Sequence, residues 1–134
     1  MPFPKVEKID SLIADKYSVS LMSDSKWDKL IEGVTNIFEQ GVHVNYKLIH
    51  SIEVFSTILT SADLKPFFIE PILYKEVEWL EFPAIYEDFI STDNLKAGRK
   101  KYLQCIDNIE ATIESVGQFD LERTEHSIKM FAYK

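Results

Sequence analysis

The fold is decided by one stretch of sequence, Pro71-Ile72-Leu73-Tyr74-Lys75-Glu76-Val77-Glu78-Trp79-Leu80-Glu81-Phe82-Pro83. Its bulky aliphatic and aromatic residues favour extended backbone. A proline limits it at each end, because proline has no N–H to donate to a strand ladder. The stretch therefore predicts a central strand against which helices pack, with Trp79 turned inward and the glutamates turned toward water.

Neither face of this predicted strand is purely apolar. Alternation places Leu73, Lys75, Val77, Trp79 and Glu81 on one face and Tyr74, Glu76, Glu78, Leu80 and Phe82 on the other. Either both faces are partly covered, or a β-bulge between Trp79 and Leu80 shifts the alternation.

Two helices are predicted before this strand. The first covers residues 4–16, where apolar residues recur at helical spacing. The second begins at one of three capping residues, Ser23, Asp24 or Ser25, and ends at Gly41. Its apolar stripe is the clearest helical pattern in the chain and contains Trp27, Leu30, Ile31, Val34, Ile37 and Phe38.

Residues 42–48 alternate strictly and predict a strand with one buried face. Residues 52–59 are ambiguous: their β-branched content favours a strand, but Ile52, Phe55 and Leu59 would also share one face of a helix. We predict a strand there.

The second half of the chain is predicted to begin with an irregular segment, 84–91. A long helix follows from Thr92 or Asp93 to Val116, just before Gly117. Two alternating runs, 119–123 and 128–133, then predict a closing hairpin. Grouped helices and hairpins are typical of an α+β fold. We therefore predict one α+β domain over residues 1–134, with a mostly antiparallel sheet and helices packed on one face.

The composition is that of a soluble, folded protein. The 134 residues match one ordinary domain, with 46% apolar and 28% charged residues. The net charge of −7 disfavours nucleic acid and anionic membranes as partners and favours a basic protein. No signal peptide, membrane anchor or membrane-spanning run is recognisable, and a single cysteine suits a reducing compartment. These features predict a cytoplasmic protein.

The sequence predicts no metal site, no cofactor and no catalytic nucleophile. The three histidines, His43, His50 and His126, are not spaced as ligand pairs. Glycine-rich phosphate loops and nucleophile elbows are missing from the sequence. Cys105 is expected to be a partly buried small hydrophobe in the long helix.

Carboxylates are the better candidates for a site. Glu76 and Glu78 are expected to point the same way from the central strand, with Tyr74 beside them and Glu81 further along. Paired carboxylates can split their pKa values and act as acid and base. Exposed acidic residues on a sheet are more often solvated or part of a binding surface. We therefore predict Tyr74, Glu76, Glu78 and Glu81 as binding residues and name no catalytic residue.

The predicted long helix has an unusual charge distribution. Basic residues occupy its first half and acidic residues its second: Lys96, Arg99, Lys100 and Lys101, then Asp107, Glu110 and Glu114. This order opposes the helix macrodipole. We expect neighbouring elements or a partner to offset it.

Three stretches carry a resemblance to a known family. They are Ser23-Asp24-Ser25-Lys26-Trp27-Asp28-Lys29-Leu30, Lys75-Glu76-Val77-Glu78-Trp79-Leu80-Glu81, and Glu122-Arg123-Thr124-Glu125-His126-Ser127-Ile128-Lys129-Met130-Phe131-Ala132-Tyr133. Their content and order resemble a family of small bacterial proteins known as a domain of unknown function. The family often has a glycine after Thr-Glu, where this chain has His126-Ser127. The resemblance implies a bacterial cytosolic protein and brings no catalytic residues with it.

Two functions follow as hypotheses. The first is a non-catalytic protein-binding domain, in one form an immunity-type inhibitor whose acidic face covers a basic partner. The second is a small hydrolase or lyase that uses Glu76 and Glu78 with help from Tyr74. The sequence neither requires nor rules out a homodimer through an exposed strand edge.

Overall fold

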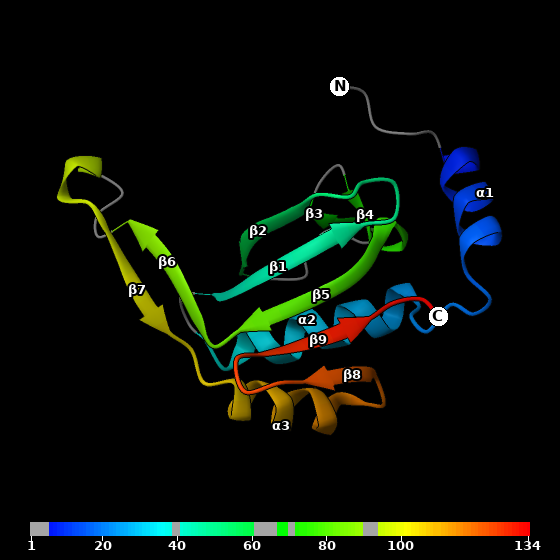
Figure 1. The fold of residues 1–134 in the computed structure, drawn as a ribbon. Coiled ribbons are helices and arrows are strands. Elements are labelled where there is room, and N and C mark those ends of the chain that lie inside the picture. Colours follow the sequence, from blue (N-terminus) through cyan, green and yellow to red (C-terminus); the bar gives the residue numbers. More distant parts are fainter. Residues whose placement is uncertain (1–5, 39–40, 61–66, 70–71, 90–93) are drawn as a thin grey trace.

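The computed structural model of the chain describes residues 6–38, 41–60, 67–69, 72–89 and 94–134. Its order of elements is shown in Figure 1. The helices are α1 (Val6–Lys16), α2 (Asp24–Asn36) and α3 (Ile106–Val116), with the short 3-10 helices η1 (Tyr74–Glu76) and η2 (Leu95–Ala97). The strands are β1 (Val42–Leu48), β2 (Val54–Leu59), β3 (Phe67–Ile69), β4 (Ile72–Leu73), β5 (Val77–Pro83), β6 (Ile85–Phe89), β7 (Arg99–Leu103), β8 (Asp120–Arg123) and β9 (Ser127–Phe131).

Five strands form the main sheet in the order β2-β1-β5-β9-β8, and every neighbouring pair is antiparallel. Strand β5 lies in the middle and forms the second half of the central strand predicted over residues 71–83. The strand predicted over residues 52–59 is confirmed as β2, and the closing hairpin is confirmed as β8 and β9. The α+β fold with an antiparallel sheet is therefore confirmed.

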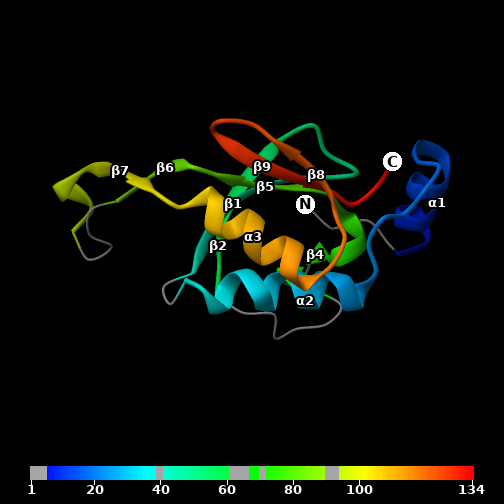
Figure 2. The ribbon, with the colours of Figure 1, turned by 90° about the horizontal axis from the view of Figure 1, so that it is seen from below.

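Helices α2 and α3 cover one face of the main sheet, whereas α1 lies beyond its end (Figure 2). The apolar stripe of α2 is buried from Trp27 to Val34, and Ser23 caps the helix by accepting the Lys26 N–H at 3.2 Å. The Trp27 ring stacks on Tyr74 at 5.6 Å and meets the edge of Phe68 at 5.9 Å. The core therefore lies between the sheet and these two helices, and the opposite, open face is not covered by them.

The predicted central strand is broken near its start. Residues 74–76 form η1 instead of continuing the strand. Two side chains hold this turn: Glu76 Oε2 accepts the Leu73 N–H at 2.6 Å, and the Tyr74 hydroxyl donates to Asp28 at 2.6 Å. The local bond between Glu76 and Leu73 is of the kind that competes with a strand ladder, and only Val77–Pro83 pairs in the main sheet.

A two-stranded arm replaces two predicted elements. Residues 85–89 were expected to be irregular and 99–103 helical, but they pair as β6 and β7. Both expectations were wrong. Gly98 has a φ of +90°, which ends a helix at that point. The predicted helix starts, Thr92 and Asp93, lie outside the described residues, and the helix itself begins only at Ile106.

The arm also explains the unusual order of charges in the predicted long helix, because most of the basic residues lie in β7 and the acidic ones in α3. Lys101 lies directly across from Glu87 in the β6–β7 ladder, where opposite charges are favourable. Asp107 falls in the first turn of α3, the end that the macrodipole makes favourable for an acid. Neighbouring elements of the same chain therefore offset most of the unusual distribution.

Candidate functional site

A β-bulge in β5 determines which side chains of this strand lie on the open face of the sheet. Lys47 pairs with Trp79 and Leu48 with Val77, so Glu78 is the extra residue. A bulge was predicted as one of two explanations, one residue later than it occurs. It places Val77, Leu80 and Phe82 toward the helices, fully buried. Glu78, Trp79 and Glu81 are only partly buried and lie on the open side, so the expected inward Trp79 was wrong.

The four predicted binding residues do not lie together. Tyr74 and Glu76 are buried within the core side of the molecule, each 1% exposed. Glu78 and Glu81 remain on the open face. The expectation that Glu76 and Glu78 point the same way was wrong. Glu76 lies in the η1 turn, whereas Glu78 lies in β5, so the two residues do not belong to one continuous strand. The geometry on which the hydrolase or lyase hypothesis depends is therefore missing.

Glu78 is held by two neighbours. It forms an ion pair with Lys47, and its Oε1 accepts the Tyr17 hydroxyl at 2.6 Å. Burial raises the pKa of Glu78, but the hydrogen bonds from Lys47 and Tyr17 outweigh burial, and its pKa lies below the ordinary value. Glu78 is therefore a carboxylate at neutral pH and has no proton to give as a general acid.

Glu81 belongs to a polar row that crosses four strands. Its Oε1 accepts from Asn45 Nδ2 and its Oε2 from Ser127 Oγ, both at 3.2 Å. Asn45 Oδ1 in turn accepts the Ser56 hydroxyl at 2.6 Å. The row thus links β2, β1, β5 and β9 on the open face and fixes the orientation of the Glu81 carboxylate.

An aromatic patch lies beside this row. Trp79 is opposite Phe131 in the β5–β9 ladder. The Lys129 ammonium lies 4.2 Å from the centre of the Trp79 ring and 6.0 Å from that of Phe131, within cation–π range. The open face therefore presents a tryptophan between two carboxylates, Glu78 and Glu81.

A cleft of about 430 Å³ opens where the arm leaves the sheet. Its lining includes His43, Asn45, Ser56, Ile58, Tyr86 and Arg99. His43 and Tyr86 stack with ring centres 4.3 Å apart. Sequence reasoning missed this cleft because it took residues 84–91 as irregular. The signal was present, since Ile85, Tyr86 and Phe89 are all strand-favouring residues.

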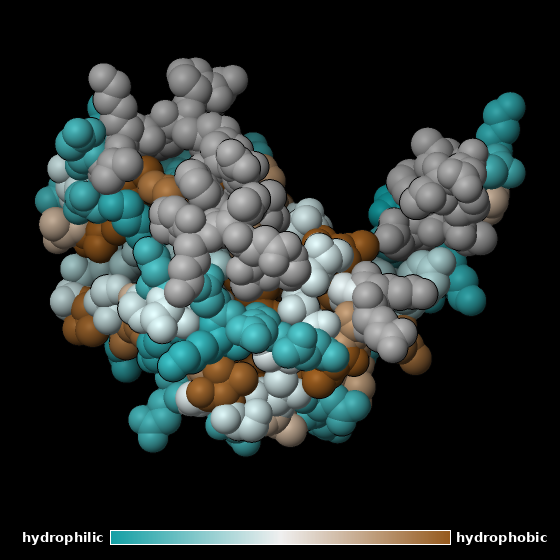
Figure 3. Space-filling view, turned by 180° about the vertical axis from the view of Figure 1, so that it is seen from behind, coloured by the Kyte–Doolittle hydropathy of each residue, from teal (hydrophilic) through white to brown (hydrophobic). Residues whose placement is uncertain are grey.

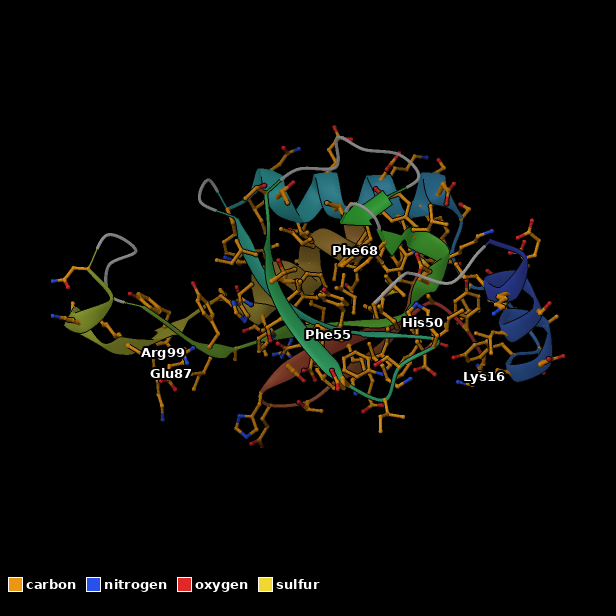
Figure 4. The ribbon with its side chains drawn as sticks, turned by 90° about the horizontal axis from the view of Figure 1, so that it is seen from above. Lys16, His50, Phe55, Phe68, Glu87 and Arg99 are labelled. Atoms are coloured by element: carbon orange, nitrogen blue, oxygen red, sulfur yellow. The ribbon has the colours of Figure 1, made fainter. Side chains whose placement is uncertain are left out.

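The arm stands away from the body (Figure 3). Glu87 and Arg99 lie side by side on it (Figure 4), with 3.8 Å between Arg99 Nε and Glu87 Oε1. At its base, Gln104 donates to the backbone oxygens of His43 and Pro83 at 2.8 and 2.7 Å. Gln104 Oε1 also accepts the His43 N–H at 3.1 Å. One side chain thus fastens the arm to both β1 and β5.

The three histidines lie in separate places. His43 is in the cleft, His50 Nε2 lies 2.9 Å from Glu76 Oε1, and His126 is exposed in the β8–β9 turn. Within the described part of the chain, no three histidine, cysteine or acidic side chains group as metal ligands. Cys105 is exposed, not partly buried as expected, because it precedes α3 instead of lying within a long helix.

The geometry defines a class of protein: a small α+β fold whose antiparallel sheet has helices on one face and an open, aromatic and acidic surface on the other. The chain belongs to a family of unknown function, DUF6678, whose model matches residues 9–134. The expected resemblance to an uncharacterised family is confirmed. No curated protein and no solved structure matches the chain. None of the helices in the described ranges has the length and apolar character needed to cross a membrane.

Proposed function

We propose that the protein is a non-catalytic protein-binding domain that docks its partner on the open sheet face. The observation that carries this proposal is the placement of Trp79, partly exposed on a face without helices and flanked by Glu78 and Glu81. Tryptophan is enriched among the residues that dominate binding energy at protein interfaces. Its ring is held in place by Lys129, so little side-chain freedom is lost on binding.

Charge supports a basic partner. The chain has a net charge of −7, and α3 contains three acidic and no basic residues. Strand β8, at one edge of the sheet, adds Asp120 and Glu122. A field of this sign speeds the encounter with a basic protein and slows the encounter with nucleic acid.

The finer form of the proposal is an immunity-type inhibitor in a bacterial cytoplasm. Such an inhibitor needs a rigid surface and no catalytic group, which agrees with the immobilised Glu78 and Glu81. The exposed thiol of Cys105 fits a reducing compartment, where a free cysteine stays reduced.

An affinity experiment tests the docking surface. The immobilised protein is incubated with lysate of its source cells at low and high salt, and retained proteins are identified by mass spectrometry. Trp79→Ala should weaken retention of a basic protein by roughly tenfold or more, and Glu81→Gln should weaken it to a lesser degree. Glu125→Gln, the same change in an exposed turn, is the matched control and should bind like the wild type.

Two outcomes would overturn the proposal. One is that no protein is retained at low salt. The other is that Trp79→Ala and Glu125→Gln retain the same proteins equally well. For the immunity form, the captured partner is then expressed alone and together with this chain. Growth should stop in the first case and recover in the second, and a partner that is harmless alone contradicts that form.

A further inference from the structure

The two edges of the main sheet differ in a way that points to a second copy of the chain. Strand β8 is four residues long, and three of them are charged: Asp120, Glu122 and Arg123. Short, charged edges resist pairing with other chains. Strand β2, the opposite edge, reads Val-Phe-Ser-Thr-Ile-Leu and has neither a charge nor a proline. It therefore lacks the charged residues and the proline that often protect an edge strand.

Strand β2 also exposes apolar side chains. Val54 and Ile58 lie on the open-face side of β2, 57% and 44% exposed, and Ser56 lies between them. Figure 4 looks along the sheet from the β2 side, with Phe55 marking the strand. Among the described residues, β1 is the only strand that pairs with β2. An edge strand without a second strand partner is the kind of edge to which a further strand adds.

We propose that two copies of the chain pair through β2, antiparallel, about a two-fold axis that passes beside Ser56. Directly opposite residues of an antiparallel pair share a face. Centring the pair on Ser56 places Val54 of each copy opposite Ile58 of the other, and Ser56 opposite Ser56. Centring it on Thr57 would instead oppose Ser56 to Ile58, so the first register buries more of the exposed apolar surface.

The sequence of β2 selects a second copy over a different partner. An interface with two-fold symmetry must be self-complementary, and the open-face pattern apolar–polar–apolar of Val54, Ser56 and Ile58 reads the same in both directions. Charge does not oppose this pairing locally. Across β1 and β2, Lys47 is the only lysine, arginine or carboxylate, and it is already paired with Glu78.

The pairing joins two five-stranded sheets into one. A two-fold axis perpendicular to the sheet places both sets of helices on one side and both open faces on the other. Trp79 and Glu81 are in β5, two strands in from the paired edge. The dimer therefore leaves the proposed docking face uncovered and stands independently of the proposed function.

Sedimentation velocity on the full chain tests the dimer. The wild type should change from the chain mass of 15.6 kDa to twice that value as concentration rises. Val54→Lys or Ile58→Glu alone should raise the dissociation constant about tenfold or more, since each buries a charge opposite an apolar residue. Ser56→Lys should do the same by placing like charges on the axis. Val19→Lys, at an equally exposed valine outside the sheet, should leave the dimer unchanged.

The double variant Val54→Lys/Ile58→Glu decides the register. Each lysine then faces a glutamate of the other copy, so the double variant should dimerise more tightly than either single variant. The two positions lie four residues apart on one strand, about 13 Å, which excludes rescue within one copy. A wild type that stays monomeric at every concentration overturns the proposal. A double variant no tighter than the singles overturns the register, and circular dichroism confirms that each variant is folded.

Discussion

Within the described part of the chain, Glu76 is the only charged residue that is fully buried. Its two oxygens are both engaged, one 2.9 Å from His50 Nε2 and the other accepting the Leu73 N–H. Its backbone oxygen also accepts the Ile49 N–H at 2.8 Å. The residue therefore joins the turn after β1 to the start of β5, and its role is structural.

Removing this carboxylate should be costly. We predict that Glu76→Ala lowers the free energy of unfolding by about 3 kcal/mol, because it leaves His50 and a buried N–H without their partner. Glu76→Gln keeps an acceptor and should lose less. Urea unfolding measures both, and Glu125→Ala in the exposed turn should stay within about 0.5 kcal/mol of the wild type. Equal losses for Glu76→Ala and Glu125→Ala would contradict this role.

Glu78 should make the free energy of unfolding depend on pH in the acidic range. Because its pKa is lower in the folded state than the ordinary 4.5, it stabilises the fold above that pH and loses this contribution as pH falls through its folded pKa. The difference in unfolding free energy between wild type and Glu78→Gln should thus be largest near neutrality and shrink below about pH 4.5. Urea titrations at several pH values test it. A difference that stays constant over this pH range would refute the assignment.

At the scale of elements, one amide side chain fastens the base of the arm to the sheet. Gln104 makes three hydrogen bonds to the backbone of β1 and β5. We predict that Gln104→Leu, which is similar in size, destabilises the protein by about 2 kcal/mol and speeds hydrogen exchange in the arm. Gln118→Leu, at an exposed position, is the matched control. Unchanged exchange in β6 and β7 would show that the arm is held by other contacts.

The sequence predicts elements well where one periodicity dominates. The stripe of α2 from Trp27 to Val34, the alternation of β1 and the closing hairpin appear as expected, because each buries one face of a regular element. The same helix was expected to continue to Gly41, but α2 ends at Asn36 and Ile37 is exposed. Prediction failed where single residues override the pattern. Gly98 divides the expected long helix, and the Glu76 carboxylate closes a turn within the expected strand. Each effect comes from a single residue, through its backbone conformation or its side-chain hydrogen bond, and hydrophobic periodicity does not register it.

The candidate site shows the same limit. The glutamates were expected to face water, and Glu78 and Glu81 do lie on the open face, although strict alternation had placed them on opposite faces of the strand. Tyr74 and Glu76 were expected beside Glu78, but the η1 turn, which alternation does not predict, buries both. The cleft with His43 and Tyr86 was missed because its two walls lie 43 residues apart in the chain and meet only through the arm.

At the scale of the whole molecule, the arm should be dispensable for folding. Tyr86 and Tyr102 are directly opposite in the ladder, so an Asn-Gly turn can replace residues 87–101 between them. The stack of Tyr86 on His43 and the Gln104 contacts remain. We predict a shortened protein that still unfolds cooperatively, with a melting temperature within about 5 °C of the full chain. Loss of a cooperative thermal transition would show that the arm belongs to the folding unit.

The two tryptophans lie on opposite sides of the same sheet, Trp27 in the core and Trp79 on the open face. Their indoles sit in different environments, one dry and one beside an ammonium group and solvent. Intrinsic fluorescence therefore contains two separate reporters. In a Trp27→Phe protein, the tryptophan emission maximum and its quenching by iodide report on Trp79 at the open face. In a Trp79→Phe protein, they report on Trp27 in the core. The fluorescence of Trp79 can therefore report binding at the open face, and that of Trp27 can report unfolding of the core.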